Sequence, residues 1–83
     1  MSIDDTLADR GKLYGDFRGQ GDLVQTLKAD VREHEFWEDL DGDMKEAIDM
    51  ILHKISRIIN GDPLYKDSWT DIIGYARCVE RRL

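Results

Sequence analysis

Residues 54–76, KISRIINGDPLYKDSWTDIIGYA, contain the end of one helix, a tight polar loop and the start of a second helix. Upstream of the loop, apolar residues recur at intervals of three and four, at Met44, Ile48, Ile51, Ile55 and Ile58. This spacing predicts a helix over 43–60 with one deeply buried face. Gly61 is a common helix stop, and Pro63 follows just beyond it.

The helix after the loop is predicted over 67–83. Its buried side is expected to carry Trp69, Ile72, Ile73, Ala76, Val79 and Leu83. Gly74 lies inside it and costs about 1 kcal/mol relative to Ala, which is tolerable if another helix approaches closely there. Cys78, late in this helix, is expected to be a buried small hydrophobe. Together the two helices form a long C-terminal helical hairpin.

Two further helices are predicted upstream, over 2–11 and 22–36. Gly11 fits the end of the first, and apolar residues at Leu23, Leu27 and Val31 mark the core side of the second. Between them, Tyr14 and Phe17 either close a turn over the core or line a ligand pocket. The expected fold is all-α, with three to four helices in a small antiparallel bundle that forms one domain over 1–83.

Bulk composition limits the function. The chain has 83 residues, a net charge of −6 and one Cys. So short a domain has marginal stability, and pairing with a second copy as a homodimer would help it. The absence of a disulfide pair, a membrane span and a signal-peptide pattern predicts a cytoplasmic location. The acidic balance argues against non-specific nucleic-acid binding. It fits a metal site, a basic partner or, most commonly, a solvated surface.

Acidic side chains follow one stripe on each helix of the hairpin. The stripes consist of Glu46, Asp49, His53 and Arg57 on 43–60, and of Asp67, Asp71 and Tyr75 on 67–83. Facing acids on two helices are how all-α proteins build divalent-metal sites, and Mg²⁺ takes carboxylates and water. Lys54, Arg57 or Lys66 would then hold phosphate oxygens.

The same side chains have structural explanations. Glu46 and Asp49 fit a solvated helix face, and Asp67 fits the N-cap of the last helix. Asp71 fits an ion pair with Arg57 across the hairpin. A lone histidine such as His53 is more often structural than catalytic.

Helix geometry separates the two sets of acids by roughly 10 Å along the hairpin axis. A shared metal would therefore need helices from a second subunit or an atypical packing. The geometry favours a cluster beside the loop, made of Lys54, Arg57, Asn60, Asp67 and Asp71. Tyr14 and Asp16 would join it if the N-terminal loop folds over, and Tyr75 is a further candidate ligand residue.

The stretches KISRIINGDP and DSWTDIIGYA, with YGDF upstream, resemble a family of small phage and prophage proteins of unassigned function. The resemblance covers 6–83. It extends more distantly to phage nucleotide-modification-associated domains and to all-α nucleoside triphosphate pyrophosphohydrolases of the MazG kind. The latter likeness implies Mg²⁺ bound by Asp67 and Asp71, with Glu46 or Asp49 assisting and a metal-activated water attacking a nucleotide.

Two functions follow as hypotheses. The first is binding of a nucleotide or its phosphates near the loop, as a Mg²⁺-dependent nucleotide pyrophosphohydrolase if the chain is catalytic. The second is a non-catalytic acidic accessory protein that binds and modulates a host or phage protein, such as an inhibitor of a bacterial defence system. In either case we expect the cytoplasm of the host cell and no membrane association.

Overall fold

The computed structural model describes residues 2–83, which form four α-helices and one short 3₁₀ helix and contain no strand. The elements are α1 (Ile3–Tyr14), α2 (Phe17–Arg32), η1 (Trp37–Asp39), α3 (Gly42–Asn60) and α4 (Lys66–Glu80). The predicted all-α class is therefore confirmed. No helix within these residues is long and apolar enough to cross a membrane.

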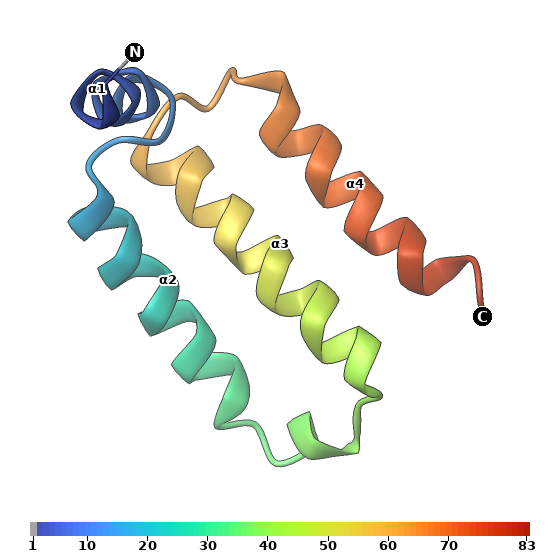
Figure 1. Ribbon diagram of the computed structural model, residues 1–83. Coiled ribbons are helices and arrows are strands. Elements are labelled where there is room, and N and C mark those ends of the chain that lie inside the picture. Colours follow the sequence, from blue (N-terminus) through green and yellow to red (C-terminus); the bar gives the residue numbers. More distant parts are fainter. Residues whose placement is uncertain (1) are drawn as a thin grey trace.

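The long helix α3 lies between α2 and α4, and each neighbour runs antiparallel to it (Figure 1). The helix α1 crosses the end of this layer where the chain passes from α3 to α4 (Figure 1). The predicted C-terminal hairpin is confirmed, because α3 and α4 pack closely along their lengths. The radius of gyration is 14.4 Å, against about 12 Å for a compact chain of this size, so the molecule is elongated.

Both upstream helices differ in extent from the prediction. The helix α1 continues through Gly11 and ends at Gly15, whose φ of 77° favours glycine. The helix α2 begins at Phe17, five residues earlier than expected, because Asp16 caps it by accepting from the Gly19 N–H at 2.9 Å. It ends at Arg32 rather than at residue 36.

The core is small. The buried apolar residues within residues 2–83 are Val24, Trp37 and Ala47. The predicted stripe on α3 is mostly half-buried, and Ile59 beside it is 66% exposed. Trp37 lies in η1, which follows α2, and closes the α2–α3 end of the layer.

The predicted buried side of α4 is only partly correct. Ile72 and Val79 are half-buried, whereas Trp69 is 51% and Ile73 69% exposed. Cys78 is exposed rather than buried. A Cβ on Gly74 would meet no atom within 4 Å, so no helix approaches there. The cause is the layered arrangement, in which α4 lies at the edge and contacts α3 along one side (Figure 1).

The open end of the hairpin is held by a charged contact. Arg82 donates to Asp41 at 2.8 Å and to Asp43 at 2.6 Å, joining the chain after α4 to the start of α3. The hydrogen bond from Arg82 lowers the pKa of Asp43, and the two carboxylates raise the pKa of Arg82. All three side chains are solvent-accessible, so the contact adds little stability.

Candidate ligand-binding site

The turn between α1 and α2 is fastened to the loop after α3, and we call this junction the clasp. Asn60 Nδ2 donates to the carbonyl oxygens of Tyr14 at 3.1 Å and Asp16 at 2.9 Å. The Asp62 N–H donates to the Leu13 carbonyl at 2.7 Å. The loop between α1 and α2 thus folds over the α3–α4 loop. This is the arrangement under which Tyr14 and Asp16 were expected to join the predicted cluster.

Two glycines permit this close approach. A Cβ on Gly15 would lie 1.9 Å from the Asn60 carbonyl oxygen, and one on Gly61 would lie 2.3 Å from the Leu13 carbonyl oxygen. Both obstacles are backbone atoms that cannot swing away. The clasp therefore depends on glycine at these two positions.

Aromatic rings line the clasp. The Arg57 guanidinium lies 4.1 Å from the centre of the Tyr14 ring, within the range of a cation–π contact. The Tyr14 and Tyr65 rings are 6.1 Å apart. The Tyr65 hydroxyl donates to Asp67 at 3.0 Å, and this hydrogen bond raises the pKa of Tyr65.

A pocket of about 410 Å³ opens beside the clasp, and we call it the Arg57 pocket. It is lined by Leu7, Arg10, Gly11, Tyr14, Gly15, Asp16, Phe17, Gln20, His53 and Arg57. The Nε atom of Arg57 is buried without a hydrogen-bond partner, and the Arg57 guanidinium takes part in no ion pair within residues 2–83. Among these residues, the positive charge of Arg57 therefore has no ion-pair partner at the pocket wall.

Cationic groups lie in and near the pocket, although the carboxylate of Asp16 also belongs to its lining. Burial lowers the pKa of His53, and the neighbouring charges of Arg57, Lys54 and Lys28 lower it further. Gln20 Nε2 lies 3.4 Å from His53 Nε2 and donates to it when that ring nitrogen carries no proton. Arg10 adds another cation to the lining. An anion entering here would meet several cationic groups.

The acids proposed for catalysis lie apart from the Arg57 pocket. Asp71 pairs with Lys54 at 2.9 Å, and Asp49 pairs with Arg32 at 2.9 Å. Asp67 accepts from Tyr65, and Glu46 is exposed. Across residues 2–83, no three His, Cys, Asp or Glu side chains gather closely enough to hold a metal ion. Binding of Mg²⁺ by Asp67 and Asp71, which the resemblance implies, stays a prediction.

The structure brings only part of the predicted cluster together. Arg57, Asn60, Tyr14 and Asp16 meet at the clasp. The suggested Asp71–Arg57 pair is replaced by Asp71–Lys54, because Arg57 turns toward Tyr14 of α1 instead. Elsewhere on α4, Tyr75 is half-buried and Lys66 is exposed.

Several pocket residues escaped the sequence interpretation. Arg10 and Gln20 were not named as site residues. Phe17 was named as one alternative for lining a pocket, but it was placed before a helix rather than in one. The missed signal is the spacing of Leu7, Arg10, Gly11 and Tyr14, which share one face only when α1 continues through Gly11. Phe17 and Gln20 share a face of α2 in the same way.

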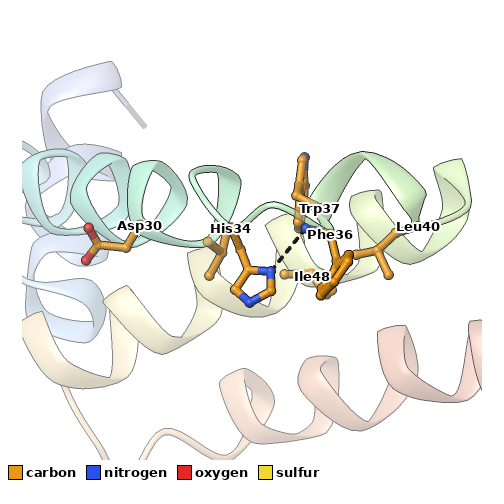
Figure 2. A pocket seen from close by; sticks show the side chains of 7 residues that line it. Asp30, His34, Phe36, Trp37, Leu40 and Ile48 are labelled. Atoms are coloured by element: carbon orange, nitrogen blue, oxygen red, sulfur yellow. Dashed lines mark hydrogen bonds between the residues drawn. The ribbon is translucent and has the colours of Figure 1, made fainter.

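A second pocket, of about 470 Å³ and mainly apolar, lies at the α2–α3 end of the molecule (Figure 2). Its lining is Asp30, Val31, His34, Phe36, Trp37, Leu40 and Ile48. The Phe36 N–H donates to His34 Nδ1 at 3.1 Å, and the two rings lie 5.5 Å apart (Figure 2). Phe36 is nevertheless 60% exposed at the rim. We call this the Phe36 pocket.

These features define a small all-α protein with one cationic and one apolar pocket. The chain is 38% identical over 73 residues to the Gene 55 protein of Mycobacterium phage D29. The match covers 88% of this chain but 44% of the phage protein, so the chain spans less than half the length of that relative. No family model and no solved structure matches the sequence.

The predicted resemblance to phage proteins is therefore confirmed by a phage homologue. The name of that homologue states no activity. The more distant likeness to nucleotide-modification domains and pyrophosphohydrolases stays a prediction.

Proposed function

We propose that the chain binds a small phosphate-bearing ligand, with nucleotides as the class, in the Arg57 pocket. The observation that carries the proposal is Arg57, whose guanidinium lines the pocket and forms no ion pair within residues 2–83. A guanidinium presents a planar fork of donors that matches phosphate oxygens. A phosphate group bound there would balance this charge and that of Arg10, which lines the same pocket together with His53.

The rest of the lining suits a nucleoside. Leu7, Tyr14 and Phe17 add apolar and aromatic surface to the same lining. A pocket of about 410 Å³ falls within the range of roughly 300–1,000 Å³ typical of small-molecule sites. Phe17 is strongly exposed in the free protein, so a stacked base would cover it.

The geometry supports binding better than hydrolysis. None of Glu46, Asp49, Asp67 and Asp71 lines the Arg57 pocket. Mg²⁺-dependent pyrophosphohydrolysis would need acids from another chain to complete the ligand set. Pyrophosphate release from nucleoside triphosphates with Mg²⁺, measured on the same samples, distinguishes an enzyme from a binding protein.

Calorimetric titration with inorganic phosphate and with nucleoside mono-, di- and triphosphates tests the proposal. We expect Arg57→Gln and Arg10→Gln each to weaken binding about tenfold, because a charged hydrogen bond contributes roughly 1.5–3 kcal/mol. Arg18→Gln is the matched control, since Arg18 is exposed on α2 and does not line the pocket.

Equal affinity of Arg10→Gln, Arg57→Gln and the native chain would exclude this pocket. Arg10 is exposed, so its replacement separates lost binding from lost folding. Arg57→Gln also removes the contact with Tyr14, and its melting temperature should be measured alongside its affinity.

A second candidate function is that of a non-catalytic phage accessory protein that binds a host or phage protein, such as a component of a bacterial defence system. The Phe36 pocket favours it, because an apolar hollow with an exposed aromatic rim suits an apolar side chain of a partner. Co-precipitation from host extract with the native chain and with Phe36→Ser tests it. A partner retained equally by both would exclude this pocket as the contact.

A further inference from the structure

The outer face of α4 carries apolar side chains that no other helix within residues 2–83 covers. Trp69, Ile73 and Ala76 recur at intervals of four and three on this face, and all three are exposed. Ser68, Ile72 and Val79 lie on the side of α4 that packs against α3, and they are buried or half-buried. Because α4 lies at the edge of the layer, its outer face is open to another molecule (Figure 1).

The outer face also contains a groove. It has a volume of about 330 Å³ and is lined by Ile72, Ile73, Ala76, Arg77 and Glu80. Four of these residues, Ile73, Ala76, Arg77 and Glu80, are spaced as the four residues that form a hole in helix–helix packing. Such a hole receives one large side chain from a facing helix. The outer face therefore contains both a large side chain that can insert, Trp69, which we call the knob, and a hole that can receive one.

We infer that a second copy of this chain packs antiparallel against the outer face, with the two-fold axis beside Ile73 and Trp69 of each copy in the groove of the other. In an antiparallel pair centred on Ile73, position 73 − n of one copy faces position 73 + n of the other copy. Trp69, four before, then faces Arg77, four after. This placement brings the knob to the hole in both halves of a self-complementary interface.

Charge complementarity selects the second copy and the orientation. Lys66 lies seven positions before Ile73 and Glu80 seven after, so the antiparallel pair sets opposite charges face to face on both sides of the axis. Arg77 would lie against the Trp69 ring, a favourable cation–π contact. A parallel pair would instead set Lys66 against Lys66 and Arg77 against Arg77, which repel.

Trp69 is already held in a fixed position. Its indole Nε1 donates to the Pro63 carbonyl at 2.8 Å, while half of the side chain remains exposed. A side chain ordered before association loses less conformational entropy on binding. The interface is small, however, so we expect association in the micromolar range rather than a permanent dimer.

Sedimentation of the 83-residue chain over about 1 µM to 1 mM tests the dimer. We expect a monomer–dimer equilibrium that Ile73→Glu shifts to monomer throughout, because two carboxylates would meet at the axis. Ile73 is largely exposed, so this change should leave the helical circular dichroism unaltered. Gly74→Ala, on the other side of α4, should not weaken the dimer. A monomer at every concentration, or a dimer unaffected by Ile73→Glu, would overturn the inference.

A charge exchange tests the orientation. Lys66→Glu and Glu80→Lys alone should each weaken self-association about tenfold, because each homodimer then contains two like-charge pairs. An equimolar mixture of the two variants should form a heterodimer of near-native affinity, since both pairs are again opposite in charge. The double variant should also recover. If the mixture associates no better than the separate variants, the antiparallel register is wrong.

Discussion

The clasp and the outer face of α4 differ in how their exposed groups are paired. At the clasp, backbone carbonyls of the α1–α2 turn are satisfied by the Asn60 amide within the chain. On α4, apolar side chains are left exposed. Unsatisfied polar backbone must be paired locally, whereas an apolar face can remain open until a partner arrives. The molecule therefore has one closed junction and one open junction.

Replacing a clasp glycine should have the largest effect on stability. A Cβ at Gly61 would meet the Leu13 carbonyl oxygen at 2.3 Å and the Tyr14 backbone at 2.4 Å, so the two segments must separate. We expect Gly61→Ala to lower the free energy of unfolding by about 2–3 kcal/mol, as for other overpacked sites. Urea denaturation followed by circular dichroism measures this loss.

The matched control is Gly74→Ala in α4, at a position away from the apolar outer face. Gly74 lies within α4, and a Cβ there would meet nothing within 4 Å. The same substitution should raise the free energy of unfolding by up to about 1 kcal/mol, because alanine favours the helix. If both alanines have the same sign of effect, the contrast between a closed and an open junction is wrong.

The Lys54–Asp71 pair should give an intermediate effect that depends on which partner is removed. Lys54 is 12% exposed and Asp71 is 47% exposed. Asp71→Asn leaves a mostly covered ammonium without its counter-charge, whereas Lys54→Met leaves a carboxylate that water can solvate. We expect Asp71→Asn to lower the free energy of unfolding by about 1 kcal/mol and Lys54→Met to lower it by less. Both effects are smaller than those of a fully buried pair, because water screens the exposed carboxylate.

Thermal unfolding of the two variants and of the double variant separates the pair from its surroundings. A larger loss for Lys54→Met than for Asp71→Asn would contradict the exposures on which the prediction depends.

The sequence was sufficient for the hairpin because the apolar period of α3 and the stop at Gly61 are local signals. It was insufficient for α1 and α2, because the roles of Gly15 and Gly19 depend on tertiary contacts. Both glycines accommodate Asn60 from a distant part of the chain, and of Gly11, Gly15 and Gly19 only Gly15 ends a helix. The presence of a glycine in the sequence does not show whether it ends a helix or makes room for another part of the chain.

The site was predicted in part for the same reason. Asn60, Arg57, Tyr14 and Asp16 were expected near one another, and they meet at the clasp. The choice between Lys54 and Arg57 as partner of Asp71 depends on Tyr14, which attracts Arg57 toward α1. Helix periodicity within the hairpin contains no information about that ring.

The smallest expected effect is a pH dependence at the clasp side, carried by His53. Its pKa is lowered in the folded chain, first by burial and then by Arg57, Lys54 and Lys28. As the pH falls through the ordinary histidine value, the unfolded chain takes up the proton before the folded chain does. The free energy of unfolding should therefore be lower at about pH 5.5 than at about pH 8.

Comparing the native chain with His53→Gln isolates this contribution, which we expect to be below about 1 kcal/mol because the ring is only half-buried. Sulfate sharpens the test, since its charge is constant over this range. If the Arg57 pocket binds anions, bound sulfate should stabilise protonated His53 and reduce the loss of stability at low pH. The same reduction in His53→Gln would show that this effect of sulfate does not act through His53.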